Sequence, residues 1–329
     1  MALNYPRLDN ASGVWTLKEV TDAVKGGYWP NAAGGRLLFG GGNQPSSTDT
    51  IEYITAATTG NSEDFGDLTA ARVNCLRAAG SFTRILWGGG DTGDASNIID
   101  YVTASTTGNA ADFGDLTVAR NAGGSSNSTR AVYWSNTSGS NVIDYVQMAS
   151  TGNATDFGDS TDARYGGGLA ESPTRSVYGG GGTPTVTNII DYITIATTGN
   201  ATDFGDINTA TKGGMGGCSN STRGVFGAGY TPTNLSQLEY VEIASTGNSI
   251  DYGDLSAAKQ FVGANASSNR GIFGGGGTPS SINVIEYFAI PIGGTVADFG
   301  DLTAVWSQIA VGSNTHGGLN DGNQGVVDT

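Results

Sequence analysis

The segment Asp203-Phe204-Gly205-Asp206 decides the fold, because close copies of it recur along the chain. The six copies begin at residues 64, 112, 156, 203, 251 and 298, at intervals of 48, 44, 47, 48 and 47 residues. An acidic residue followed by tyrosine precedes each copy, as in Asp191-Tyr192. A period of about 40–50 residues is that of a four-stranded propeller blade. The sequence therefore predicts an all-β protein, a six-bladed β-propeller with four antiparallel strands per blade.

Each repeat carries the signals of four strands. A short strand ends in glycines, as at Ile272–Gly275, and a longer β-branched strand follows, as at Ile189–Thr197. Thr198-Gly199-Asn200 is typical of a turn, since Gly and Asn tolerate positive φ. The third strand starts in Asp-Phe-Gly-Asp and is expected to continue through Leu116–Ala119 and its equivalents. The fourth is rich in small residues, as at Gly213–Cys218, and we place it nearest the axis, where strands converge.

The ends of the repeat region indicate how the ring closes. The first unit starts at its glycine-ended strand, Leu37–Gly42, without an innermost strand before it. Ser307–Gly312 lies beyond the last third strand and aligns with the innermost strands of the other units. We therefore expect the C-terminal strand to complete the first blade, within a propeller spanning residues 34–314 and followed by a tail at 315–329. A seventh blade, divided between both termini, is the alternative.

Residues 1–33 form a segment outside the repeats, which we interpret as a docking segment. Thr16-Leu17-Lys18-Glu19 has the form of a capping box, and Gly26-Gly27 offers a C-cap. Apolar residues between these signals recur at helical spacing, which predicts one short helix over residues 16–25. The candidate docking residues are Trp15, Leu17, Val20, Tyr28 and Trp29.

The glycine-ended strand, the aromatic of the second strand and the Ala119-Arg120 ending of the third resemble a kelch repeat. The resemblance covers about residues 35–314 and implies a kelch-like propeller. One departure is that Phe of Asp-Phe-Gly-Asp stands where kelch units usually have Trp. The string Gly13–Val20, followed by Gly27-Tyr28-Trp29-Pro30, resembles a short module of bacteriophage structural proteins. The repeat itself resembles repeats in proteins of aquatic phages.

These phage likenesses imply a structural protein of the virion, associated with a tail or fibre. The partners that they imply are other virion structural proteins and a glycan or protein of the host surface, and a homo-oligomer is compatible with this role. The N-terminus has neither a basic start nor an apolar core, so no signal peptide is expected and synthesis is placed in the host cytoplasm.

Charge and composition narrow the partners further. The chain has 15 basic and 30 acidic residues, a net charge of −15, which disfavours nucleic acid and anionic membranes. No run approaches 18 apolar residues, so membrane insertion is not expected. Cys75 and Cys218 fall at different places in the repeat, and nothing suggests that they pair in a disulfide.

Most charged residues hold fixed repeat positions, which indicates Arg–carboxylate pairs and Asp-capped turns repeated in each blade rather than a ring of ligand sites. Eleven of the 15 basic residues do so: Arg36, Arg84, Arg130, Arg175, Arg223 and Arg270 before the glycine-ended strand, and Arg72, Arg120, Arg164, Lys212 and Lys259 at the end of the third strand. The Asp-Phe-Gly-Asp carboxylates leave calcium open as an alternative, but they lack the dense alternation of calcium loops. We therefore expect no metal and no cofactor.

No catalytic machinery is apparent. His316 is the single histidine, near what we expect to be a loose C-terminus, and it has no cluster for zinc and no neighbouring nucleophile. A glycan-active enzyme such as a lyase or copper oxidase is a third hypothesis, but one histidine cannot supply the usual copper ligands. The near-equal repeats carry no long insertion, and we expect a non-enzymatic protein.

The loop after each glycine-ended strand varies between repeats, and such loops on a rigid scaffold are the usual place for recognition. Their residues are polar and rich in hydroxyls, which suits sugars or a protein partner, with plain solvated turns as the alternative. The candidate binding residues are Asn43, Asp91, Thr183, Tyr230 and Thr278. Two functions follow: adhesion or assembly in a phage virion, or a lectin-like carbohydrate-binding propeller outside a virion.

Overall fold

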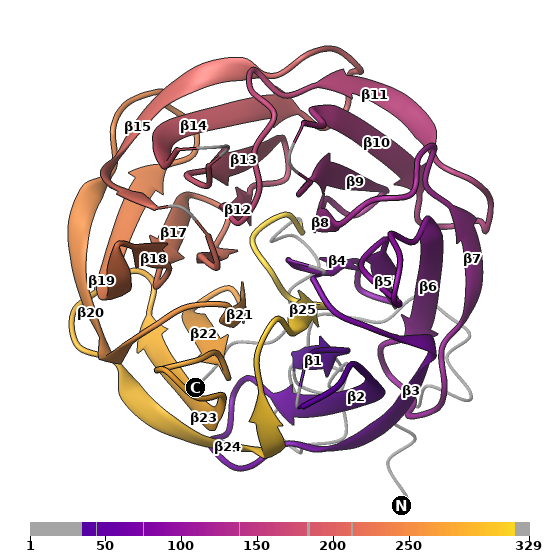
Figure 1. Ribbon diagram of the computed structural model, residues 1–329, viewed down its shortest axis with the longest axis horizontal. Coiled ribbons are helices and arrows are strands. Elements are labelled where there is room, and N and C mark those ends of the chain that lie inside the picture. Colours follow the sequence, from indigo (N-terminus) through magenta and orange to yellow (C-terminus); the bar gives the residue numbers. More distant parts are fainter. Residues whose placement is uncertain are drawn as a thin grey trace, which may run out of the picture.

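The computed structural model describes residues 35–319 except residues 44, 75, 138, 183, 184 and 212. Its strands form six sheets arranged around a central axis (Figure 1). The predicted N-terminal helix at residues 16–25 lies outside the described residues. The six-bladed propeller is confirmed, and the alternative of seven blades is wrong.

The four main strands of each blade follow one another from the axis outward. Blade 1 contains β25 (Ala310–Ser313), β1 (Arg36–Gly40), β2 (Thr48–Thr55) and β3 (Glu63–Arg72). Blade 2 contains β4 (Ala79–Gly80), β5 (Arg84–Gly88), β6 (Ile98–Thr103) and β7 (Ala111–Asp115). Blade 3 contains β8 (Ala122–Ser126), β9 (Arg130–Ser135), β10 (Val142–Gln147) and β11 (Thr155–Asp159).

The second half of the ring repeats this order. Blade 4 contains β12 (Gly168–Glu171), β13 (Arg175–Gly179), β14 (Thr187–Thr194) and β15 (Thr202–Thr211). Blade 5 contains β16 (Gly216–Ser219), β17 (Arg223–Gly227), β19 (Thr233–Glu242) and β20 (Ile250–Lys259), with the short strand β18 (Tyr230–Thr231) paired to β19. Blade 6 contains β21 (Gly263–Ala266), β22 (Arg270–Gly274), β23 (Ile282–Ala289) and β24 (Ala297–Trp306).

The ring closes as the sequence predicts. β25 pairs antiparallel with β1, from Leu37 opposite Ser313 to Gly40 opposite Ala310. The last strand of the described residues therefore supplies the innermost strand of the first blade, and Figure 1 shows the yellow β25 beside the indigo β1. In the other blades too, the first strand is short, stands at one edge of its sheet and lies nearest the axis (Figure 1), as predicted.

The third strand departs from its predicted length in two blades. β7 ends at Asp115 and β11 at Asp159, whereas the third strands of the other blades run for ten residues. The expected strand continuation through Leu116–Ala119 is therefore wrong. In the blades whose third strand runs for ten residues, the end of that strand pairs with the start of the second strand, as where Arg72 lies opposite Thr48. β6 begins later in its repeat, at Ile98, and offers no such partner.

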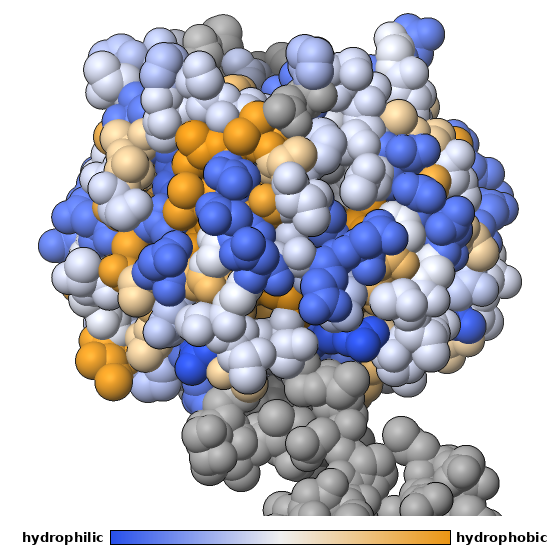
Figure 2. Space-filling model, turned by 90° about the horizontal axis from the view of Figure 1, so that it is seen from below, coloured by the Kyte–Doolittle hydropathy of each residue, from blue (hydrophilic) through white to orange (hydrophobic). Residues whose placement is uncertain are grey.

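The hydrophobic core lies between the blades. Each of six clusters of buried side chains joins residues of neighbouring sheets, as where Phe65 of blade 1 packs with Ile85 and Val102 of blade 2. The Phe of Asp-Phe-Gly-Asp also meets the Tyr of the acidic-Tyr pair edge to face, with 5.8 Å between the ring centroids of Tyr53 and Phe65. Hydrophilic and weakly polar residues dominate the rim of the ring (Figure 2).

The predicted turn at Thr198-Gly199-Asn200 serves a different purpose. The chain turns earlier, at Ile195-Ala196, and the Gly-Asn pair instead lies against the preceding blade. Gly199 N donates to Phe157 O at 2.8 Å, and Asn200 Oδ1 accepts from Asp159 N at 3.1 Å. A Cβ on Gly158 would lie 2.5 Å from the Gly199 carbonyl oxygen, so this approach requires glycine. The two most regular motifs of the repeat thus bind neighbouring blades together.

The alternating strand directions give the ring two different faces. We call one the upper face: it carries the connections from each third strand to the next blade and the loops after the glycine-ended strands. The lower face carries the Gly-Asn contacts. β1 starts and β25 ends at the lower face, so the described chain enters and leaves the ring there.

Candidate functional site

The basic residues that follow the Asp-Phe-Gly-Asp segments form ion pairs between blades, at the end of the third strand in blades 1 and 5 and beyond its end in blades 2 and 3. Arg120 lies 2.8 Å from the Asp144 carboxylate and Arg164 lies 3.0 Å from that of Asp191, and all four side chains are buried. Arg72 pairs likewise with Asp100, and Lys259 with Glu286. The expected Arg–carboxylate pairs are confirmed at these positions, where they join each blade to the next; Lys212 lies outside the described residues.

The second basic set takes different partners from those predicted. The guanidinium of Arg130 lies over the ring of Tyr145, 4.8 Å from its centroid, and its Nη1 donates to Ile195 O of the next blade at 3.0 Å. The other five repeat this stacking on a tyrosine of their own blade. Of these six arginines, Arg223 also pairs with a carboxylate, that of Glu242 at 2.9 Å. The repeated charges therefore bind the ring together.

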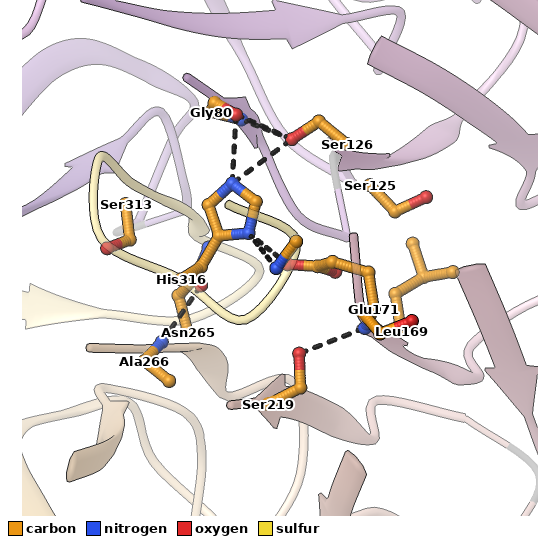
Figure 3. A network of polar contacts seen from close by, with 12 residues as sticks. Gly80, Ser125, Ser126, Leu169, Glu171, Ser219, Asn265, Ala266, Ser313 and His316 are labelled. Atoms are coloured by element: carbon orange, nitrogen blue, oxygen red, sulfur yellow. Dashed lines mark hydrogen bonds and ion pairs between the residues drawn. The ribbon is translucent and has the colours of Figure 1, made fainter. Parts of the chain in front are cut away.

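The lower end of the central channel holds a buried charged network (Figure 3). Arg77 donates through Nη2 to Glu171 Oε1 at 2.6 Å and to Asn265 Oδ1 at 2.7 Å. His316 Nδ1 lies 2.6 Å from the same Glu171 oxygen, and Nε2 lies 2.8 Å from Gly80 O. Burial raises the pKa of Glu171, but the charges of Arg77 and His316 and their hydrogen bonds outweigh it and hold this pKa below its ordinary value.

His316 belongs to a segment that crosses the channel. Residues 314–319 follow β25 across the centre of the ring (Figure 1), and Gly317 N donates to Ser219 O of blade 5 at 3.0 Å. The His316 side chain is 1% exposed, so His316 itself does not lie in a loose segment. Residues 320–329 lie outside the described residues. His316 contacts blades 2, 3 and 4 because glycines on its C-terminal side let the backbone approach: a Cβ on Gly318 would overlap Ser126 O.

The upper end of the channel opens into a cavity of about 380 Å³. Its walls come mainly from the connections between each third strand and the next innermost strand, so every interface between blades contributes. The lining residues are Asn74, Leu76, Asn121, Asn136, Thr137, Tyr165, Gly166, Gly214, Met215, Phe261, Val262, Gln308 and Ile309. None of them is charged. The channel thus ends in an uncharged cavity above and a charged network below.

Three lining residues have strained backbones. Phe261, Gln308 and Asn74 have φ values of 55°, 59° and 61°, in the left-handed region that disfavours residues with a Cβ by about 1–2 kcal/mol. The equivalent positions of two other repeats carry Gly166 and Gly214. Glycine thus satisfies this backbone conformation elsewhere in the ring. At the cavity the larger side chains of Phe261, Gln308 and Asn74 adopt it and lower the stability of the fold. Backbone strain of this kind is frequent at functional sites.

The amides of the cavity differ in how they are satisfied. Asn136 Oδ1 accepts from Gly166 N at 2.5 Å and holds one wall in place. Asn121 Oδ1 is buried without a hydrogen-bond partner in the protein. Buried polar atoms of folded proteins nearly always have a partner, so an unpaired acceptor in the wall of a cavity calls for an explanation.

The candidate binding residues share a face with the cavity but do not line it. Asn43, Asp91 and Thr278 lie in loops of the upper face, and Tyr230 begins the short strand β18 on the same face. Asp91 and Tyr230 pair through their backbones with the segments that form the cavity walls, and Tyr230 is 38% exposed. Thr183 and the docking residues Trp15, Leu17, Val20, Tyr28 and Trp29 lie outside the described residues.

The sequence did contain a signal for the cavity residues. Several of them stand one or two positions after the residue that ends the third-strand segment, where Asn, Tyr, Phe or Gln replaces the glycine of other repeats, as at Tyr165, Phe261 and Gln308. The loops after the glycine-ended strands vary more visibly between repeats, so loop variation alone indicates those loops and not the connections that line the cavity.

Few other sites for chemistry occur in the described part of the chain. It holds no group of three or more His, Cys, Asp and Glu residues arranged to bind a metal. Burial raises the pKa of the Cys218 thiol to about 12, which leaves it protonated and a poor nucleophile near neutral pH. This part of the chain contains no helix that is long and apolar enough to cross a membrane.

No family model matches the chain, and no curated protein is significantly similar to it in sequence. The likeness to kelch repeats and to phage structural proteins therefore depends on short sequence motifs alone.

Proposed function

We propose that this protein is a non-enzymatic recognition module of a phage virion, held through its lower face and binding with its upper face. The observation that carries the proposal is the difference between the two faces. The cavity and the variable loops share the upper face, while β1 starts and β25 ends at the lower one. A module attached through its chain ends would thus leave the cavity and the loops open to a partner.

The virion assignment is supported by the likeness of residues 13–30 to a module of phage structural proteins. This segment leads into β1 and hence into the lower face. Its partners would be other virion structural proteins, in a tail or fibre, and the upper face would meet a glycan or protein of the host surface. The absence of charged side chains among the described residues that line the cavity favours an alternative of the same binding class, a lectin-like propeller that works outside a virion.

The first experiment locates the protein by immunogold electron microscopy on purified virus particles from the source material. Gold at one fixed place on intact particles supports the virion role, and the place distinguishes tail from capsid. Gold that is absent from particles while the free protein is abundant in the lysate contradicts it and supports the lectin-like alternative.

A second experiment tests the division between the two faces. Deletion of residues 1–33 should abolish binding to the particle and leave binding to host cells intact, since the two are assigned to opposite faces. Tyr230→Ala on the upper face is the matched control and should leave particle binding unchanged. Particle binding that survives the deletion would refute the docking role of the N-terminal segment.

A further inference from the structure

We infer that the cavity of the upper face is a binding site for one neutral sugar ring, at the end of a glycan or as a free saccharide. The inference rests on the proposed recognition function and names the ligand class of the upper face. It assigns binding to the third-strand connections rather than to the variable loops.

The size and closure of the cavity set the scale of the ligand. A volume of about 380 Å³ is at the lower end of the range for small-molecule pockets, roughly 300–1,000 Å³. Below it, Arg77, Glu171, Asn265 and His316 fill the axis and are all buried. Within residues 35–319 as described, the site is therefore closed at its lower end and open to a ligand at the upper face. A pocket of this kind accommodates one sugar ring rather than an extended chain.

The charge of the cavity selects against ionic ligands. Among the described residues, no Lys, Arg, His, Asp or Glu lines it, so an anion or a cation would lose its hydration without gaining a charged partner there. The net charge of −15 further opposes anionic ligands. A neutral ligand is therefore favoured. The four amide side chains and one threonine hydroxyl of the lining make a purely apolar ligand a poor match.

The polar groups match the hydroxyls of a sugar. A hydroxyl both donates and accepts a hydrogen bond, and so does an amide side chain, through its NH₂ and its carbonyl oxygen. Asn121 lines the cavity and has an acceptor without a partner, which a ligand hydroxyl would satisfy after a rotation about the soft terminal torsion of the side chain. Asn74 and Gln308 bring further amides to the same cavity.

Two aromatic rings supply an apolar surface beside these amides. Tyr165 and Phe261 flank the same piece of backbone: a Cβ on Gly213 would lie 3.9 Å from the Tyr165 ring, and one on Gly214 would lie 3.0 Å from Phe261 Cδ1. Phe261 is 37% exposed. Aromatic faces beside hydrogen-bonding groups suit a sugar, which has an apolar C–H face and a polar edge.

The strained backbone of Phe261 is the evidence that this ring serves a ligand. Its φ of 55° would suit glycine, which the equivalent positions in blades 4 and 5 have. A large apolar side chain that is partly exposed and held in an unfavourable backbone conformation gains little for the fold. Its presence is explained if the ring is needed at the cavity.

The test measures binding of neutral methyl glycosides of glucose, galactose, mannose and N-acetylglucosamine to the full chain by isothermal titration calorimetry. Methyl glucuronide and glucosamine serve as charged counterparts. We expect at least one neutral glycoside to bind and both charged sugars to bind at least tenfold more weakly. Phe261→Gly should abolish this binding without lowering the melting temperature, because glycine relieves the strain. Asn121→Leu should weaken binding at least tenfold.

Val118→Ala is the matched control, an exposed apolar residue that does not line the cavity, and should bind as the native chain does. Tyr230→Ala tests the variable loops of the same face. Loss of glycoside binding in Tyr230→Ala with none in Phe261→Gly would overturn the cavity site while leaving recognition by the upper face intact. Binding of the chain to host cells with no response to any glycoside would overturn the saccharide class alone. Binding neither to cells nor to particles would refute the proposed function itself.

Discussion

The two ends of the central channel are built on opposite principles. At the lower end, Arg77, Glu171 and His316 bury charges and satisfy them with one another. At the upper end, Phe261 and Gln308 accept backbone strain and leave a cavity without charges. The contacts at the lower end stabilise the fold, whereas the strained residues at the upper end lower its free energy of unfolding. Substitutions at the two ends should therefore change the free energy of unfolding in opposite directions.

The largest effect is expected at the lower end, for Glu171→Gln. The substitution keeps the shape of the side chain but leaves the buried Arg77 without its counter-charge, which costs about 3–5 kcal/mol. Urea unfolding measures the loss. Glu63→Gln removes an exposed carboxylate and is the matched control, with little change expected. Equal effects of the two variants would refute the structural importance of the network.

Acid should reproduce part of this loss. Because the pKa of Glu171 is held below its ordinary value of 4.5, the folded protein has a contribution to stability that is complete above that pH. The contribution disappears as the pH falls through the lower pKa of the folded state. The melting temperature of the native chain should therefore fall more steeply below about pH 4.5 than that of Glu171→Gln. Parallel curves for the two proteins would contradict the assignment.

A smaller loss is expected for His316→Ala. The substitution removes contacts of the imidazole with Gly80 O, Ser126 and the Glu171 carboxylate, and hydrogen bonds to charged groups contribute about 1.5–3 kcal/mol. Urea unfolding again provides the measurement. The fold should persist, since the six blades keep their own contacts. A stability equal to that of the native chain would show that the crossing segment does not hold the lower end.

The smallest effect should have the opposite sign. Gln308→Gly at the upper end relieves a φ of 59° and should stabilise the fold by about 1 kcal/mol. Gly214→Ala is the converse variant and should destabilise it, because its Cβ would lie 2.4 Å from Phe261 N. Thermal unfolding distinguishes the signs. Destabilisation by Gln308→Gly would remove the contrast between the two ends.

The fold could be predicted because it depends on what the repeats share. The six copies of Asp-Phe-Gly-Asp predict the number of blades. The first unit lacks an innermost strand before Leu37, which predicts the closure by β25. The sequence predicted that the repeated basic residues pair with carboxylates, as Arg164 does with Asp191. It did not predict that these ion pairs join two blades, because spacing within a repeat does not show which sheet a side chain faces.

The candidate site could not be predicted in the same way, because it depends on what the repeats do not share. The cavity gathers single irregular residues, such as Asn121 and Phe261, from connections far apart in sequence. His316 appears isolated in the sequence, yet the closure of the ring brings it to Glu171. Nothing in the residues around His316 indicates this neighbour, since its position follows from where β25 ends.

The closure by β25 also bears on how the chain is made. β1 ends at Gly40 and its inner partner begins at Ala310, 270 residues later. At a synthesis rate of about 5–20 residues per second, the inner edge of β1 waits roughly 15–55 s for its partner. An unpaired strand edge invites pairing with other chains. A ribosome that stops before β25 thus releases an open arc of blades with an unpaired strand edge, and the four residues of β25 separate this fragment from the closed ring.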